Sequence, residues 1–359
     1  MGVLLEPGGI VSAVEQSDSM PLLRVDDLSV AYSVRGRGGK RTVSAVDHVS
    51  FDIARAQTLG LVGESGCGKT TTGRTLLGRI PVAGGRMWFD GKDITHLDRR
   101  GWRRLHSEIQ LIFQSPYSSM NPRMTVSEII GEPLMMHGMK GDRLQARVDE
   151  LLDLVRLPRS AGRRYPHAFS GGQRQRVVIA RALALSPRFV VADEPVSALD
   201  VSIQAQVIAL MMELQRDLGM SYLFVAHNLA VVRHIADRVA VMYLGNIVEI
   251  GDKASLYANP THPYTRSLLS AAPIPDPAVK RPQRIMLKGD PPSPIDPPTG
   301  CRFHTRCAHA VEQCAVDRPP MVSVDTDHLV ACWVTAPPSD QPVNLRTKPQ
   351  QLTPEGVPS

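Results

Sequence analysis

The sequence predicts an α/β fold built on a largely parallel β-sheet, and two observations support this prediction. Three short apolar runs stop abruptly at polar residues, which is the pattern of strands buried inside a parallel sheet. A helical pattern follows each run, and strands that alternate with helices indicate an α/β architecture. The runs are TLGLV (58–62), FVVAD (189–193) and SYLFVAH (221–227).

Two β-rich segments precede the first apolar run. They occupy residues 22–53 and are separated by the Gly- and Arg-rich sequence RGRGGKR (35–41), which we expect to be the loop of a hairpin. Residues 115–187 are predicted to form a mostly helical insert. The clearest helix covers 204–218, where apolar residues recur every three or four positions before Gly219, a residue type common just past a helix end.

The composition fits a globular protein with more than one domain. The chain has 359 residues, 43% of them hydrophobic and 21% charged, so it can bury a full core. No run approaches the roughly 18 consecutive apolar residues of a spanning helix, and no signal peptide is evident, so we expect a cytoplasmic protein. The net charge of +6 comes from scattered arginines without aromatic interleaving, which favours a solvated surface over a nucleic-acid site.

The ends of the chain differ in composition from its middle. Residues 1–20 and 336–359 lack periodicity, so we expect two flexible tails. From residue 259 the sequence becomes proline-rich and irregular, which predicts a small appended domain over 259–335. The main α/β domain would then occupy residues 21–258.

A phosphate-binding motif follows the first apolar run. The segment from Gly63 to Thr70 fits G-x-x-x-x-G-K-[ST] between a strand and a helical sequence, which is the context that this motif requires. Its glycines let backbone N–H groups turn inward around an anion, at the positive end of the helix. Lys69 is placed to reach the β- and γ-phosphates, and Thr70 to ligate Mg²⁺. The candidate nucleotide-binding residues here are Gly63, Ser65, Gly66, Cys67, Gly68, Lys69, Thr70 and Thr71.

Two adjacent carboxylates end the second apolar run. Asp193 is placed to hold the Mg²⁺ shell, and Glu194 to orient and deprotonate an attacking water. A strand that ends in Asp-Glu is a weak signal alone. Beside a phosphate-binding loop it predicts ATP hydrolysis.

A third motif resembles that of a known family. The sequence FSGGQ, with Phe169 followed by Ser170, Gly171, Gly172 and Gln173, resembles the signature loop of ABC transporter ATPase subunits, which is usually LSGGQ. The resemblance implies a P-loop NTPase core of RecA type, with an antiparallel β subdomain and a helical ABC subdomain. In that family the signature loop is a second anion site that closes on the γ-phosphate of the opposite subunit, which implies a dimer.

The resemblance also implies roles for four further residues. Gln114, in LIFQSP, matches the lid-loop glutamine that touches Mg²⁺ and the membrane partner, and His227 matches the γ-phosphate switch. Asp200 ends the D-loop sequence SALD. Tyr32 matches the aromatic residue that stacks on adenine, and a tyrosine at a strand edge is the less favoured alternative.

Two longer stretches resemble the oligopeptide/dipeptide importer branch, namely FQSPYSSMNPRMTVSEIIGEPL and NPTHPYTRSLLSAAP. The first resembles the F-type ATPase subunit more than its D-type partner. The resemblance implies a D-type heterodimer partner, two permease subunits and an extracytoplasmic solute-binding protein, with this chain at the cytoplasmic face of the inner membrane. Residues from Gln114 to Pro133 would form the groove for a permease helix, with Tyr117 and Met120 as coupling residues.

Other interpretations stay open at this point. The same motor could serve importers of nickel, opines or glycosides, because specificity lies in the binding protein and the permeases. A soluble ABC ATPase that acts on nucleic acid usually has two fused cassettes, a long coiled coil or CxxC pairs, and the sequence contains none of these. A P-loop kinase or GTPase would give no reason for the sequence FSGGQ.

Four cysteines cluster late in the chain. Cys301, Cys307, Cys314 and Cys332 follow a C-x5-C-x6-C-x17-C pattern. Four thiols match the ligand count of tetrahedral zinc and of a 4Fe-4S cluster, and the spacing does not distinguish between them. Free structural cysteines are a third possibility. Resemblance to peptide-importer ATPases with a similar cluster favours iron–sulfur. Its role would be a structural staple for a region with few apolar residues.

Overall fold

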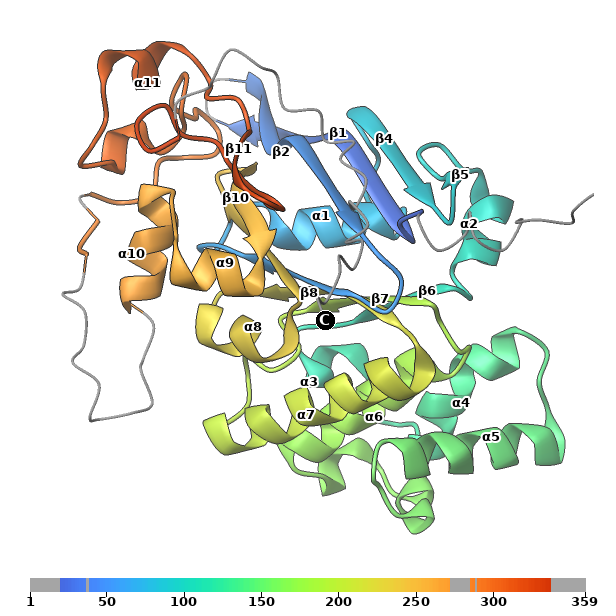
Figure 1. The fold of residues 1–359 in the computed structure, drawn as a ribbon. Coiled ribbons are helices and arrows are strands. Elements are labelled where there is room, and N and C mark those ends of the chain that lie inside the picture. The colour runs from blue at the N-terminus through green and yellow to red at the C-terminus, as the bar shows by residue number, and fades with distance from the viewer. Residues whose placement is uncertain (1–19, 37–38, 272–284, 288, 337–359) are drawn as a thin grey trace, which may run out of the picture.

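The computed structural model describes residues 20–36, 39–271, 285–287 and 289–336 (Figure 1). Almost all of the two predicted tails lies outside these ranges. A large sheet runs through the middle of the molecule, with a smaller antiparallel sheet on one side and helices on the other. Within the described ranges no helix is both long and apolar enough to cross a membrane.

The large sheet has eight strands in the order β11-β12-β10-β9-β3-β8-β7-β6. The five strands from β9 to β6 are parallel to one another, and β10, β12 and β11 continue the sheet in antiparallel pairings. The three predicted apolar strands are confirmed as β3, β7 and β8. The strands of this sheet are β3 (Thr58–Val62), β6 (Ile109–Ile112), β7 (Phe189–Asp193), β8 (Ser221–Ala226), β9 (Arg238–Tyr243), β10 (Asn246–Asp252), β11 (Val322–Asp325) and β12 (His328–Val330).

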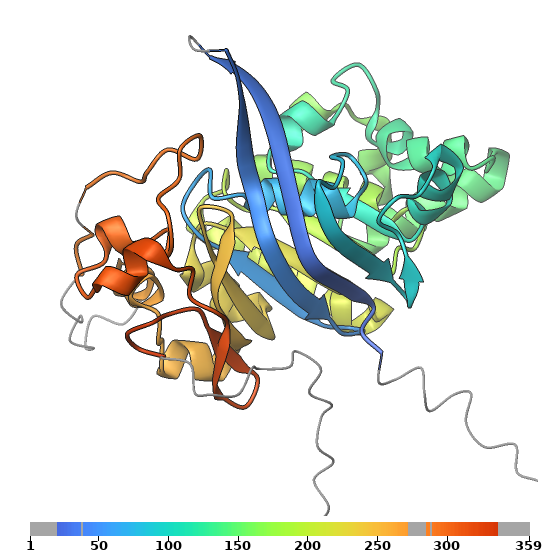
Figure 2. The ribbon, with the colours of Figure 1, turned by 90° about the horizontal axis from the view of Figure 1, so that it is seen from above.

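The small sheet has four antiparallel strands in the order β2-β1-β4-β5. Figure 2 shows β1 and β2 as the long blue hairpin. The hairpin was predicted correctly, but the predicted loop over 35–41 was too long, because Arg35 pairs with Lys40 and Gly36 pairs with Gly39. Backbone pairing between the two strands overrides the low strand preference of glycine here. These strands are β1 (Leu23–Gly36), β2 (Gly39–Ile53), β4 (Gly84–Phe89) and β5 (Lys92–Asp93).

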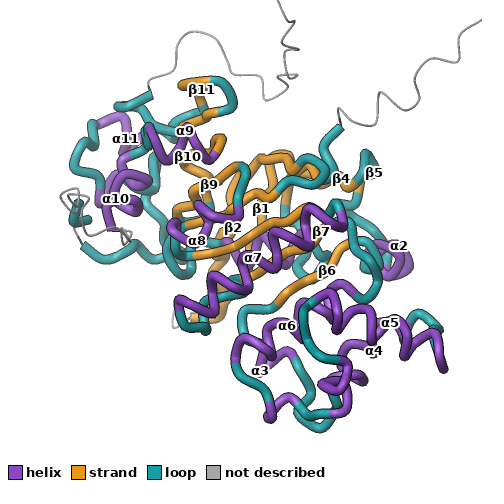
Figure 3. Tube along the Cα trace, turned by 60° about the horizontal axis from the view of Figure 1, so that its bottom comes forward, coloured by secondary structure: helices purple, strands orange, loops and turns teal. Residues whose placement is uncertain are grey.

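The helices flank the large sheet (Figure 3). The predicted helix over 204–218 is part of α7, which begins at Val201 and ends at Leu218; Gly219 follows it in the left-handed conformation, φ 64°. The helices are α1 (Lys69–Leu76), α2 (Arg99–Leu105), α3 (Pro116–Ser119), α4 (Val126–Met136), α5 (Gly141–Leu154), α6 (Gly171–Leu183), α7 (Val201–Leu218), α8 (Leu229–Ile235), α9 (Lys253–Ala258), α10 (Pro263–Ala271) and α11 (Glu312–Val316). Short 3-10 helices are η1 (Arg159–Arg163), η2 (Pro166–Ala168) and η3 (His304–Arg306).

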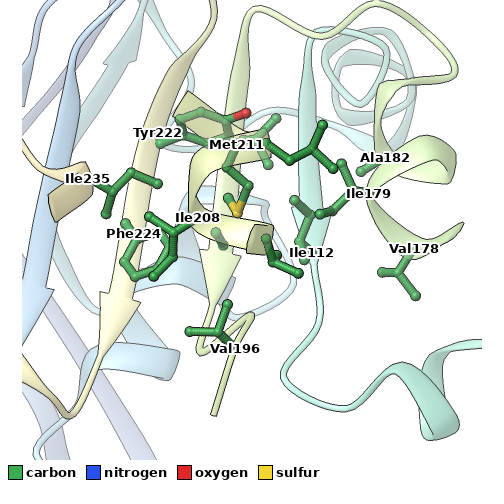
Figure 4. Close-up of a cluster of buried hydrophobic side chains, with 14 of the residues drawn as sticks. Ile112, Val178, Ile179, Ala182, Val196, Ile208, Met211, Tyr222, Phe224 and Ile235 are labelled. Carbon is green, nitrogen blue, oxygen red and sulfur yellow. The ribbon is translucent and has the colours of Figure 1, made fainter. Parts of the chain in front are cut away.

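Both faces of the large sheet are buried, which explains its continuously apolar strands. On one face, side chains of β8 such as Tyr222 and Phe224 pack against α6 and α7 (Figure 4). On the other face, alternate residues such as Leu223 and Val225 pack against α1 and the small sheet. The carboxyl ends of the parallel strands are therefore held rigidly from both sides.

The C-terminal region is joined to the large sheet. Strand β12 pairs with β10 through Glu249 opposite Val330 and Ile250 opposite Leu329. Strands β11 and β12, which lie within the predicted appended domain, are part of the main sheet. Figure 1 shows the orange and red region beside β10 and β2.

Candidate nucleotide-binding site

The predicted phosphate-binding loop connects β3 to α1. The Lys69 ammonium group is buried and donates to the carbonyl oxygens of Gly63 and Glu64, each at 2.8 Å. Gly68 precedes α1 at φ 108°, and a Cβ atom there would lie 2.2 Å from the Ala45 carbonyl oxygen. Only glycine fits this position, so the loop can pass close under β2 and begin α1 with its N–H groups free to face an anion.

Thr70 and Asp193, two of the three predicted magnesium ligands, lie in direct contact, whereas the third, Gln114, bonds to Glu194. The Thr70 hydroxyl donates to Asp193 Oδ1 at 2.9 Å, although the residues are 123 positions apart in sequence. Burial at the end of β7 raises the pKa of the Asp193 carboxyl, and its hydrogen bond to Thr70 acts in the opposite direction. A hydroxyl and a carboxylate at the phosphate-binding loop fit Mg²⁺, which takes oxygen ligands and usually keeps several waters.

The three residues predicted to be catalytic meet at one carboxylate. Gln114 Nε2 donates to Glu194 Oε2 at 2.8 Å, and His227 Nδ1 lies 3.4 Å from the same oxygen. They follow β6, β7 and β8, which are adjacent parallel strands, so their side chains gather at the carboxyl edge of the sheet. A cavity of about 30 Å³ beside Glu194 and His227 is large enough for a water molecule.

Tyr32 lies on β1 beside the first turn of α1. Its hydroxyl donates to Thr71 Oγ1 at 3.4 Å, and its ring remains partly exposed on β1. The ring therefore flanks the first turn of α1, within reach of a nucleotide bound at the loop.

The predicted signature residues begin α6. Ser170 and Gln173 form a reciprocal capping box, in which each side chain accepts from the other residue's backbone N–H. A Cβ atom at Gly172 would lie 2.5 Å from a methyl carbon of Ile203 on α7. Asp200 is the N-cap residue of α7 and is exposed. No hydrogen bond within the described part of the chain joins Ser170–Gln173 to the phosphate-binding loop.

Comparison with known proteins identifies the family. Residues 46–197 match the family described as "ABC transporter", and residues 248–314 match "Oligopeptide/dipeptide transporter, C-terminal region". The chain is 48% identical over 326 residues to the oligopeptide transport ATP-binding protein OppF of Salmonella typhimurium, covering 88% of this chain and 97% of the relative. This chain belongs to the ABC transporter family. OppF of Haemophilus influenzae is 46% identical, over 87% of this chain and 96% of its own.

Solved structures confirm the predicted fold class of this ABC ATPase. The structure of cbiO1 from Clostridium perfringens, part of the ABC transporter complex cbiONQ, superposes with a TM-score of 0.60 at 26% identity, covering 67% of this chain and 92% of that one. The ATP-binding cassette MJ0796, a dimer in a post-hydrolysis state bound to ADP and Pi, gives 0.58 at 25% identity, covering 64% and 98%. The ABC ATPase is accordingly an enzyme that hydrolyses ATP, and ATP with Mg²⁺ is typical of its family.

Sequence analysis of this ABC ATPase missed three residues beside the loop. Glu64 was an unspecified position of the loop motif, and it contacts Tyr264 and Arg306 from the C-terminal region. The sequence HPYT drew attention to Tyr264 only as a mark of family resemblance. No local pattern links Arg306 to a residue 242 positions earlier.

The four late cysteines are free thiols. Burial raises the pKa of the Cys301 thiol to about 11, and the nearby thiols of Cys314, Cys332 and Cys307 add to the shift. In the described ranges, however, no three Cys, His, Asp or Glu side chains are arranged to hold a metal ion. Cys314 is carried on α11, and Cys332 lies in a short bridge to Ala336. The predicted iron–sulfur or zinc site therefore receives no support from the arrangement of these thiols.

Proposed function

We propose that this ABC ATPase hydrolyses ATP to energise the import of dipeptides or oligopeptides. The observation that carries the ATPase part is the meeting of Gln114, Glu194 and His227 beside the Thr70–Asp193 pair. The peptide part is supported by relatives that are 46% and 48% identical and are named oligopeptide transport ATP-binding proteins. The names OppF also support the finer proposal of an F-type subunit.

In the proposed mechanism the loop binds the phosphates through its backbone N–H groups and Lys69. The Lys69 ammonium group exchanges its two carbonyl partners for phosphate oxygens. Thr70 and Asp193 would hold Mg²⁺, which would neutralise charge on the phosphates. Glu194 accepts the proton of the attacking water, while Gln114 and His227 orient the carboxylate and the water.

We propose that the active unit is a dimer of ATPase subunits on two permease subunits. The exposed start of α6 supports this proposal, because Ser170 would then face the phosphates bound by the other subunit. The finer proposals are a D-type heterodimer partner, an extracytoplasmic solute-binding protein and attachment at the cytoplasmic face of the inner membrane. We also propose that the ATPase domain occupies residues 21–258 and that the C-terminal domain occupies residues 259–335.

Reconstitution tests the proposed function. The chain would be purified with its permease subunits, partner ATPase and binding protein, and placed in liposomes. We expect ATP hydrolysis that rises when the binding protein and a peptide are added. Hydrolysis stimulated by nickel, an opine or a glycoside, and not by peptides, would replace the proposed cargo. Stimulation by nucleic acid alone would overturn the transport function.

A 4Fe-4S cluster, with zinc as its alternative, remains a separate proposal for the cysteines. Its support is the count of four thiols, and it requires them to move together when the metal binds. Iron, sulfide and zinc assays on anaerobically purified wild type and Cys307→Ser decide it. A colourless wild type without metal would remove the proposal.

A further inference from the structure

We propose that Arg306 and Tyr264 of the C-terminal region are positioning residues of the phosphate-binding loop, and that both act through Glu64. This inference rests on the proposed function, since it concerns the same ATP site. It assigns a task to a region outside the part of the chain that matches the ABC transporter family itself.

Arg306 forms an ion pair with the side chain of Glu64. Its Nη1 atom lies 3.1 Å from Glu64 Oε1 and 2.9 Å from Oε2. The Arg306 side chain is only 8% exposed and that of Glu64 27%, so water screens the pair incompletely. The backbone carbonyl of Glu64 accepts the Lys69 ammonium group at 2.8 Å. Glu64, which Arg306 holds, thus accepts a hydrogen bond from Lys69, the lysine that we expect to contact the phosphates.

Tyr264 holds the backbone of the same residue. The Glu64 N–H donates to the Tyr264 hydroxyl at 2.9 Å. The Tyr264 ring is fully buried, with its centroid 4.8 Å from that of Tyr243 on β9 and 5.4 Å from that of Phe303. Two side chains from the C-terminal region therefore fix both the carboxylate and the peptide N–H of one loop residue.

The segment that carries Tyr264 is itself held in place by buried hydrogen bonds. The buried carboxylate of Glu249 on β10 accepts the backbone N–H groups of Thr261 at 2.8 Å and His262 at 3.0 Å. It also lies 2.8 Å from His328 Nε2 on β12. The start of α10, which carries Tyr264, is thereby tied to the main sheet. Movement of Tyr264 would disturb the buried hydrogen bonds of Glu249.

The charge of Glu64 gives the ion pair a direct consequence for ATP. A carboxylate beside a loop that binds triphosphate repels the ligand, because the two negative charges lie close together at a partly desolvated site. Arg306 neutralises that carboxylate. Without Arg306 the residues of the loop would be unchanged, but the Glu64 carboxylate would present an uncompensated negative charge to ATP.

The affinity of the purified full-length chain for ATP-Mg tests this inference, by displacement of a fluorescent ATP analogue. We expect Arg306→Ala to raise the Kd about tenfold, the scale of one charged hydrogen bond. Adding Glu64→Gln to Arg306→Ala should bring the Kd back to within about threefold of wild type, because the repelling charge is gone. A merely structural role of Arg306 would not produce this rescue.

Tyr264→Phe and Arg318→Ala complete the design. Tyr264→Phe keeps the buried ring and removes only the hydroxyl, so it decides the inference even if Arg306→Ala does not fold; we expect a Kd about threefold higher. Arg318 is the matched control, because its ion pair at 3.1 Å is with Asp47 and not with the loop. Its replacement should leave the Kd unchanged.

Three results would overturn the inference. They are wild-type ATP affinity in both Arg306→Ala and Tyr264→Phe, absence of rescue by Glu64→Gln, and an equal loss in Arg318→Ala. If the wild-type chain binds no ATP at all, the proposed function fails with it, and that outcome is distinct from the other three.

Discussion

Glu194 adopts a left-handed backbone conformation, with φ 47°. For a residue other than glycine this conformation costs roughly 1 kcal/mol or more and persists only where neighbours impose it. Its N–H donates to the Val225 carbonyl at 3.0 Å, and its own carbonyl accepts the N–H and the hydroxyl of Ser197. The surrounding bonds therefore aim this carboxylate at Gln114 and His227 against the local preference of the chain.

Glu194→Gln should reduce ATP turnover about 100-fold or more while ATP still binds. An amide keeps the size of the side chain and its contact with Gln114 but cannot accept the proton of water. Steady-state hydrolysis and nucleotide binding, measured on the same preparation, check this prediction. Near-normal turnover would show that another group activates the water.

Lys69→Ala should act on binding instead. The substitution removes the ammonium group that the loop buries against two carbonyl oxygens and that we expect to face the phosphates. We expect a clear rise in the Kd for ATP-Mg, with the thermal unfolding of the nucleotide-free protein changed much less. If the affinity is the same as in wild type, Lys69 does not contact the phosphates.

At the scale of elements, the segment after Gln114 divides into an exposed and a buried part. Tyr117 on α3 is 66% exposed, with the Arg174 guanidinium 4.3 Å from its ring centroid. Met120, predicted with it as a coupling residue, is 6% exposed and packs in the core with the helices that follow. Met120 therefore cannot offer its side chain to a partner, and the expectation for this residue is corrected.

Substitutions at Tyr117 and Met120 should have different effects, the first on transport and the second on stability. Tyr117→Ala should leave ATP hydrolysis largely intact and reduce peptide uptake per ATP hydrolysed, because it alters only the exposed surface. Met120→Ala should lower the free energy of unfolding by about 2–5 kcal/mol, as is usual for a buried methionine. Uptake and hydrolysis in liposomes, together with thermal unfolding, check both expectations. Unchanged coupling in Tyr117→Ala would remove α3 from the proposed permease contact.

At the scale of the whole molecule, local patterns predicted three central strands of the main sheet and the candidate residues of the ATP site. TLGLV and FVVAD are continuously apolar because both faces of their sheet are covered. Strand β6 has only four residues and was missed for that reason. The pairing of β12 with β10 and the ion pair of Arg306 with Glu64 join distant positions, and no periodicity in the chain encodes such contacts.

The buried network of the C-terminal region should make stability depend on pH. Burial lowers the pKa of His262 to about 4, although the Glu249 carboxylate acts in the opposite direction. The unfolded chain binds a proton at His262 near pH 6.5 and the folded chain does not, so stability falls as pH drops from about 6.5 to about 4. Each unit of that interval corresponds to about 1.4 kcal/mol at most.

His262→Asn isolates this effect. Asparagine can keep an acceptor for the Tyr264 N–H, which His262 Nδ1 accepts at 3.1 Å, and it does not titrate. We expect a smaller fall in Tm between pH 7.5 and pH 5 in this variant than in wild type. Equal falls in the two proteins would mean that His262 becomes protonated without loss of structure.

The pairing of β12 with β10 also protects the protein from self-association. If the chain stopped at residue 258, the backbone groups of β10 that now pair with β12 would form the open border of a hydrophobic sheet. Such a border recruits strands from other molecules. The buried carboxylate of Glu249 would simultaneously lose its partners Thr261, His262 and His328. A shortened ATPase should therefore aggregate. By pairing with β10, the C-terminal region prevents strand-to-strand association at this edge and leaves the subunit free to form its functional dimer.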